Sequence, residues 1–199
     1  MAEGMERRAL MRETDVDGSV IEACRRGDRA AFQMLFEAYK DRVYSIALHY
    51  SGNTDMAGDV TQQVFLKLFT RMEQFRQDAE FTTWLYRIVA NTCIDEQRSR
   101  KRFIPLSNEA EVRDMSARGS QEDKYIRREV AVSVREAISQ LRPKLRMPIL
   151  LKYVEGLSYE EIGQALGCSK GTVASRLNRG HKILAEKLSN LRGALEPEE

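Results

Sequence analysis

The stretch GLSYEEIGQALGCSKGTVASRLNR, residues 156–179, decides the fold of the C-terminal part of the chain. Ser158 is a good helix N-cap, and Glu161, three residues later, completes a capping box. Gly167 is expected to end that short helix in the left-handed conformation, which a β-carbon penalises. Ser169 then predicts the cap of a second helix. The stretch therefore predicts two helices joined by a tight turn, the helix-turn-helix motif that lies in a DNA major groove.

The second helix of this motif is expected to have an apolar face and a cationic face. Val173 and Leu177 face the core, while four cations and no acid occur between positions 170 and 182. A merely solvated helix usually mixes the signs of its charges, so a small helical hairpin without a DNA ligand is the less favoured alternative. Arginine pairs well with guanine, and asparagine with adenine. The predicted DNA-binding residues are Lys170, Gly171, Thr172, Ser175, Arg176, Asn178 and Arg179.

The composition excludes several classes of protein. The 199 residues are 42% hydrophobic and 31% charged with a net charge of +2, which is typical of a folded rather than a disordered chain. The three cysteines and two histidines are isolated from one another, so no metal site and no cofactor is expected. A polar N-terminus and the lack of a long apolar run predict an intracellular, cytoplasmic protein with no membrane insertion.

Helical periodicity runs through the rest of the chain. Apolar residues recur at three- and four-residue spacing within about 31–50, 54–69 and 81–102, and no long strand-like alternation occurs. Asn53 or Thr54 is expected to cap the second of these helices. Pro148 lies either in the first turn of a new helix or at a kink in a longer one. The predicted fold class is all-α, with two helical domains joined by a flexible linker. Its expected parts are a tail at 1–18, a first domain at 19–102, a linker at 103–126, a helix-turn-helix domain at 127–195 and a tail at 196–199.

Three segments of the chain resemble a known family. They occur in the order DVTQQVFLKLF at 59–69, FTTWLYRIVANT at 81–92 and LSYEEIG at 157–163. Together they resemble the signature segments of bacterial sigma factors of the extracytoplasmic-function (ECF) type, the small two-domain members of the sigma-70 family. The resemblance covers about residues 20–195. It implies a non-enzymatic protein that binds core RNA polymerase and directs transcription initiation at promoters with minus-35 and minus-10 elements, expected to serve stress or envelope-response genes.

The resemblance also assigns roles to residues. It implies that the first domain is sigma domain two, which docks onto the polymerase and opens the minus-10 element, and that the second is sigma domain four, which reads the minus-35 element. The implied polymerase-binding residues are Asp59, Gln62, Gln63 and Phe65, with glutamine at position 63 where the family usually has an acid. The implied minus-10 DNA-binding residues are Arg87, Asn91, Arg98, Arg100, Lys101 and Arg102. Trp84 is expected in the core, with base stacking as the alternative.

The expected partners are core RNA polymerase, promoter DNA (duplex at minus-35 and single-stranded at minus-10) and an anti-sigma factor. One alternative is a ligand-responsive helix-turn-helix regulator that binds palindromic DNA as a dimer, without polymerase. An enzyme is the least favoured hypothesis, because no catalytic triad, phosphate loop, metal cluster or acid pair is evident in the sequence.

Overall fold

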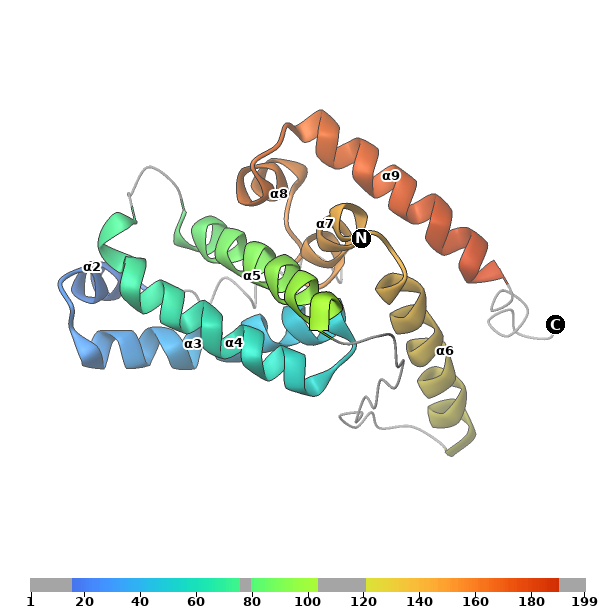
Figure 1. The fold of residues 1–199 in the computed structure, drawn as a ribbon, viewed down its shortest axis with the longest axis horizontal. Helices are drawn as coiled ribbons and strands as arrows, with labels where there is room; N and C mark the ends of the chain where they lie inside the picture. The colour runs from blue at the N-terminus through green and yellow to red at the C-terminus, as the bar shows by residue number, and fades with distance from the viewer. Residues whose placement is uncertain (1–15, 76–79, 104–120, 190–199) are drawn as a thin grey trace.

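The computed structural model describes residues 16–75, 80–103 and 121–189, with side chains described outside 101–103 and 121–128. These residues form helices and no strand, which confirms the all-α prediction (Figure 1). Residues 104–120, most of the predicted linker, lie outside the described residues. The elements are α2 (Gly18–Arg25), α3 (Arg29–Ser51), α4 (Thr54–Arg71), the 3-10 turn η1 (Met72–Gln74), α5 (Phe81–Phe103), α6 (Gln121–Ser139), α7 (Pro143–Tyr153), α8 (Tyr159–Leu166) and α9 (Lys170–Lys187).

The first domain is built on the long helices α3, α4 and α5. Asp28 caps α3, because its Oδ1 accepts hydrogen bonds from the Ala30 and Ala31 N–H groups at 2.8 and 3.2 Å. Asn53 rather than Thr54 caps α4, with Oδ1 accepting from the Met56 N–H at 2.8 Å. Residues at helical spacing on the three helices are fully buried and fill the core, among them Leu35, Val43, Ile46, Val60, Val64, Leu68, Leu85, Val89 and Cys93.

The second domain contains α6 to α9. Pro143 lies in the first turn of α7, where its missing N–H is not needed, and Pro148 lies inside the same helix. Helical structure resumes at Gln121, where α6 begins, before the boundary expected at 127. The core of this domain joins α7 to the helix-turn-helix through Leu150, Leu151, Ile162, Val173 and Leu177, all almost completely buried.

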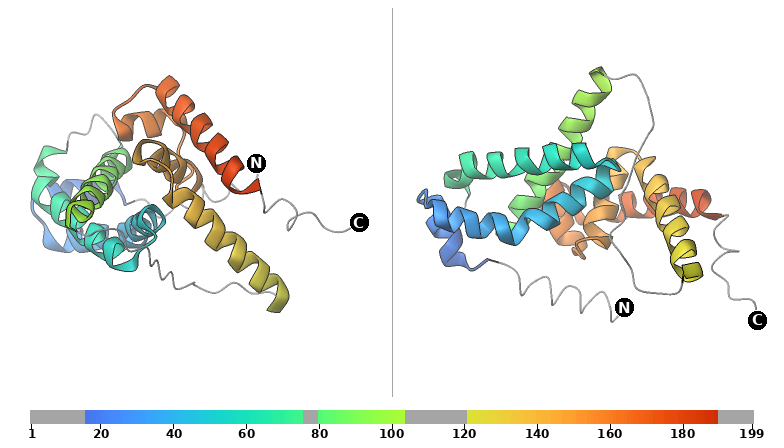
Figure 2. Two further views of the ribbon diagram at one scale, coloured as in Figure 1. Left: turned by 45° about the vertical axis from the view of Figure 1, so that its right-hand side comes forward. Right: turned by 90° about the horizontal axis from the view of Figure 1, so that it is seen from below.

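The two domains pack directly against each other. Helix α8 lies along α5, while α6 and α7 lie against α3 (Figures 1 and 2). In the second view of Figure 2 the C-terminal end of α5 extends beyond α4. Among the described residues, no helix is both long enough and apolar enough to span a membrane.

Candidate nucleic-acid interface

The helix-turn-helix has the caps that its sequence predicts. The Ser158 Oγ accepts a hydrogen bond from the Glu161 N–H at 3.2 Å, and the Glu161 carboxylate accepts one from the Ser158 N–H at 2.7 Å. Gly167 ends α8 in the left-handed region with φ of 63°. The Ser169 Oγ accepts from the Thr172 N–H at 3.2 Å and so begins α9. These four local predictions are confirmed.

The turn between α8 and α9 depends on a close approach at Gly163. A β-carbon at this position would lie 2.7 Å from the backbone oxygen of Cys168, closer than van der Waals contact allows. A backbone atom in a tight turn cannot move aside as a side chain can. Gly163 therefore lets the turn at Cys168 and the start of α9 lie close to α8.

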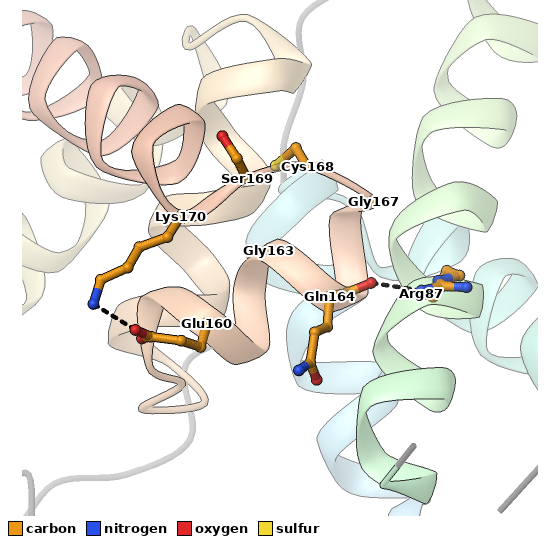
Figure 3. Close-up of a pocket in the computed structure, with 8 residues that line it drawn as sticks. All are labelled: Arg87, Glu160, Gly163, Gln164, Gly167, Cys168, Ser169 and Lys170. Atoms are coloured by element: carbon orange, nitrogen blue, oxygen red, sulfur yellow. Dashed lines mark hydrogen bonds and ion pairs between the residues drawn. The ribbon is translucent and has the colours of Figure 1, made fainter. Parts of the chain in front are cut away.

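The outer face of α9 carries the predicted minus-35 residues. Lys170, at the start of the helix, forms an ion pair with Glu160, which lowers the pKa of that exposed carboxylate (Figure 3). Arg176 is half-buried and its Nη1 approaches the Cys168 Sγ at 3.5 Å. Thr172 is also half-buried, whereas the remaining predicted residues are exposed, namely Gly171, Ser175, Asn178 and Arg179. The helix therefore presents a continuous polar face to solvent.

The opposite face of α9 explains a glycine in the middle of the helix. Gly180 is buried, and a β-carbon there would lie 3.1 Å from Ile149 Cγ1 and 3.2 Å from Ile149 Cδ1. The absence of a side chain lets α9 pack closely on α7. Gly180 therefore has a packing role.

The predicted minus-10 residues lie along α5 in different environments. Asn91 is exposed, and Arg98 is exposed with Asp95 at 4.0 Å. The Arg87 Nη2 donates to the backbone oxygen of Gln164 in α8 at 2.6 Å, as Figure 3 shows. Arg100 forms ion pairs with Asp59 and Glu96. The side chains of Lys101 and Arg102 lie outside the described residues.

The start of α5 is held by a cluster of aromatic rings. Trp84 is half-buried, and its ring centroid lies 5.2 Å from that of Phe75 and 6.0 Å from that of Phe81. Phe75 itself is buried and follows directly after η1, at the start of the segment that leads to α5. Trp84 thus packs at the edge of the core, as the spacing predicts.

The chain matches two family models. Residues 35–103 match sigma-70 region 2, and residues 131–184 match sigma-70 region 4. The chain is 32% identical over 179 residues to the ECF RNA polymerase sigma factor SigW of Bacillus subtilis, covering 86% of this chain and 96% of that protein. It is 33% identical over 189 residues to the ECF RNA polymerase sigma-E factor of Escherichia coli K12, covering 91% and 98%.

The chain belongs to the ECF sigma factors of the sigma-70 family. It is therefore an RNA polymerase sigma factor, a transcription initiation factor rather than an enzyme. Two solved structures share its fold. The sigma factor RpoE in complex with the anti-sigma factor NepR from Bartonella quintana has a TM-score of 0.63 at 22% identity, covering 79% of this chain and 96% of that one. CnrH in complex with the cytosolic domain of CnrY has a TM-score of 0.67 at 23% identity, covering 88% and 99%.

The sigma-70 region 2 domain contains a polar network between α4 and α5. The Arg100 Nη2 donates to Asp59 Oδ2 at 2.5 Å, and its Nε donates to Glu96 Oε1 at 2.9 Å. Glu96 also accepts from the Gln63 Nε2 at 3.1 Å. The hydrogen bond from Arg100, opposed by partial burial, lowers the pKa of Glu96. The network brings together residues that the resemblance assigns to different partners.

The helix α4 of this sigma factor also shows residues that sequence reasoning missed. Phe65 is buried, with its ring centroid 4.7 Å from that of Phe36. Leu66 and Phe69, in contrast, are 62% and 52% exposed. They lie four and seven residues after Gln62, which is exposed, and so share its face of the helix. That spacing was readable in the sequence, but burial alone distinguishes the outward apolar residues from the inward ones.

Proposed function

We propose that this sigma factor binds core RNA polymerase through α4, opens the minus-10 element on α5 and reads the minus-35 element with α9. The observation that carries the proposal is the recognition helix itself. The turn before it runs from Gly167, which ends α8, to Ser169, which caps α9. The outer face of α9 presents Ser175, Asn178 and Arg179 to solvent. Exposed donors on one helix face suit base edges and phosphates in a major groove.

Run-off transcription with purified core polymerase tests this function. The wild-type protein should direct transcripts from promoters selected out of a random library, and Arg179→Ala should weaken the preference for one minus-35 base by about 1–3 kcal/mol. Lys144→Ala is the matched control, because Lys144 is an exposed cation on α7 rather than on α9. Absence of any transcript with core polymerase contradicts the proposal.

The free protein provides the contrast with a conventional regulator. A regulator that works without polymerase binds its operator tightly as a dimer, with half-sites about one helical turn apart. A sigma factor should bind duplex poorly until core polymerase is added. Tight binding of the free protein to palindromic DNA in a gel shift would favour the alternative.

For polymerase docking we propose that Leu66 and Phe69 provide the apolar contact beside Gln62, Gln63 and Asp59. Two large exposed apolar side chains on one helix face are typical of a protein interface. Phe65 supports that face from within, through its contact with Phe36. Leu66→Ala should weaken binding to core polymerase at least about tenfold, whereas Val132→Ala, which truncates an exposed apolar residue on α6, should not.

Two further parts of the proposal concern regulation. We infer that the target promoters serve stress or envelope-response genes, as the family resemblance implies, and that the protein works in the cytoplasm with its polymerase. We also infer control by an anti-sigma factor, since the solved relative RpoE is bound to the anti-sigma factor NepR. Sequencing of transcript starts identifies the regulon, and co-purification from the native host identifies the inhibitor. Recovery of the protein without a partner, together with constitutive promoter activity, contradicts the second inference.

A further inference from the structure

We propose that Tyr153 and His181 form a further DNA contact beside the recognition helix, in which this aromatic pair donates a hydrogen bond to a phosphate oxygen of the minus-35 duplex. Tyr153 is the last residue of α7, and His181 lies in the second half of α9. Neither residue belongs to the minus-35 set predicted from the sequence. The inference deepens the proposed reading of the minus-35 element by α9 and rests on it.

The two side chains hold each other in one position on the surface. The Tyr153 Oη lies 2.9 Å from His181 Nε2, and the ring centroids are 5.5 Å apart in an edge-to-face arrangement. Tyr153 is nevertheless 62% exposed, and His181 is exposed as well. A surface side chain that becomes fixed on binding loses conformational entropy, which weakens the complex. Because this pair is already ordered, a ligand that contacts it meets a smaller entropic cost.

The pair has one hydrogen-bond donor more than it uses internally. A neutral histidine ring carries one N–H group, and a tyrosine carries one O–H group. If the Tyr153 hydroxyl donates to Nε2, the N–H group of the ring is on Nδ1 and is not used within the pair. If Nε2 donates to the hydroxyl oxygen instead, the O–H group of Tyr153 is the one not used. Either tautomer therefore offers one donor to an outside group that only accepts, such as a phosphate oxygen.

The pair lies on a flank of α9 that begins beside α8. Lys170 and Asn178 precede His181 by eleven and three residues, so the three side chains share this flank. At its start, Lys170 forms an ion pair with Glu160 in the first turn of α8 (Figure 3). In a helix-turn-helix the first helix crosses a DNA backbone while the second lies in the major groove. The backbone that α8 crosses therefore runs along this flank toward His181 and Tyr153.

The position and charge of the pair favour a phosphate over a base. Residues near the start of a recognition helix contact base edges, whereas His181 lies further along α9. A helix fills a major groove about 12 Å wide, so its flanks face the phosphates at the edges of the groove. Lys182 follows His181 directly, is exposed, and makes the surroundings of the pair positive. The expected ligand is therefore an anion, and the duplex read by α9 supplies one.

Binding of the reconstituted holoenzyme to its selected promoter duplex tests the contact. Tyr153→Phe removes only a hydroxyl group and should weaken binding about tenfold, through the loss of a hydrogen bond to a charged group. His181→Ala should also weaken binding, and the double variant should be no weaker than the weaker single variant, because the two side chains act as a unit. Tyr44→Phe is the matched control, since Tyr44 is 37% exposed on α3. Circular dichroism checks that each variant keeps the wild-type helix content.

The salt dependence of binding separates this contact from contacts made by cations. A tyrosine hydroxyl releases no counterion, so Tyr153→Phe should leave the slope of log affinity against log salt unchanged, whereas Lys182→Ala should reduce it by about 1. A phosphate contact also carries no sequence information. Tyr153→Phe should therefore weaken binding to every minus-35 sequence by the same factor, unlike Arg179→Ala.

Duplexes in which single phosphates are replaced by neutral methylphosphonates locate the acceptor. At one position, the replacement should weaken wild-type binding about tenfold but change the binding of Tyr153→Phe by less than about twofold. The same replacement should weaken Tyr44→Phe as much as the wild-type protein. If no position shows this difference, the pair does not contact a phosphate and the proposal is overturned.

The outcomes separate this contact from the proposed function. If the holoenzyme selects promoters but Tyr153→Phe and Tyr44→Phe bind them equally, the phosphate contact is overturned and the function stands. If Tyr153→Phe lowers transcription without lowering promoter affinity, the pair contacts a protein, which also overturns the proposal.

If no promoter is selected, the proposed function fails, and the free, full-length protein still decides the contact. Its binding to a mixed-sequence duplex at low salt should then be about tenfold weaker for Tyr153→Phe than for Tyr44→Phe. Equal affinities of these two variants would overturn the phosphate contact.

Discussion

Arg100 Nη2 lies 2.5 Å from Asp59 Oδ2, so a residue proposed to bind DNA forms an ion pair with a residue proposed to bind polymerase. Glu96 accepts from both Arg100 and Gln63 and completes the link between α5 and α4. Exposed ion pairs alone contribute little to stability. Glu96 is half-buried, however, and its position between two donors makes it the centre of the network. The orientation of the basic end of α5 therefore depends on the helix proposed to meet the polymerase.

The first prediction concerns stability at low pH. The pKa of Glu96 is lowered in the folded protein by its bond to Arg100. A group with a lowered folded pKa contributes stability above its ordinary value of 4.5, and this contribution disappears as pH falls through the folded pKa. Glu96→Gln should therefore be less stable than the wild-type protein at neutral pH and equally stable in acid.

Urea denaturation at a series of pH values measures this difference. Glu136→Gln is the control, since Glu136 is an exposed acid on α6, and it should unfold with the wild-type pH dependence. If the free energies of unfolding of Glu96→Gln and the wild-type protein differ by the same amount at all pH values, the loss of stability comes from packing rather than from the charge of Glu96.

The second prediction concerns the turn of the helix-turn-helix. Gly163→Ala places a β-carbon 2.7 Å from the Cys168 backbone oxygen and should destabilise the protein by about 1–3 kcal/mol. It should also reduce minus-35 binding, because α9 is displaced from α8. Gly171→Ala is the control for stability, since a β-carbon there meets only the Ser169 Oγ at 4.0 Å, and this variant should be at least as stable as the wild-type protein. If Gly163→Ala unfolds at the wild-type temperature or at a higher one, the expected clash is contradicted.

Local features of the helix-turn-helix could be predicted from the sequence, whereas contacts between helices could not. The caps at Asn53, Ser158 and Ser169 are local hydrogen bonds over a few residues, so the sequence alone predicts them, together with the all-α fold and the left-handed glycine. Gly180 is different, because its partner Ile149 lies on another helix. The sequence does not indicate this partner, and the packing role of Gly180 appears once α7 and α9 are placed together.

The same limit applies to contacts between the domains. The Tyr86 hydroxyl of α5 donates to Glu155 Oε2, between α7 and α8, at 2.6 Å. The two residues are 69 positions apart, and neither has a local pattern that predicts its partner. Burial raises the pKa of the Tyr50 hydroxyl to about 12, although tyrosine at helical spacing predicts only a core position. Position within one element follows from periodicity, whereas pairing across elements depends on the tertiary arrangement.

The third prediction tests the packing of α9 on α7. Gly180→Ala should destabilise the second domain by about 1 kcal/mol, because the new methyl group lies within 3.1–3.2 Å of two atoms of Ile149. Ile149→Val removes one of those atoms, Cδ1, and should cost about 0.5–1.5 kcal/mol alone. The double variant should be more stable than the sum of the two effects predicts. Strict additivity in chemical denaturation would mean that Ile149 moves aside without strain.

The last prediction is the pH dependence of the packing between the two domains. Burial raises the pKa of Glu155, against the opposing effects of the Tyr86 hydroxyl and of Arg42 and His49 on α3. When the domains separate, the carboxyl group meets water and its pKa returns toward the ordinary value of 4.5. The arrangement with packed domains therefore binds the proton more tightly than the arrangement with separated domains. Its extra stability is fully present below the ordinary pKa and is lost as pH rises through the raised value.

Scattering measurements at a series of pH values upward from the ordinary 4.5 should therefore show the domains of the wild-type protein separating as pH increases. Glu155→Gln keeps the shape and the hydrogen-bonding capacity of the side chain but has no proton to lose, so its radius of gyration should change much less over that range. His49 of α3 also acts on the Glu155 carboxyl group, and His49→Gln separates its contribution, since the pH dependence should persist in that variant. An identical pH response of Glu155→Gln and the wild-type protein would assign the opening to a group other than Glu155, because only the carboxyl group at position 155 differs between them.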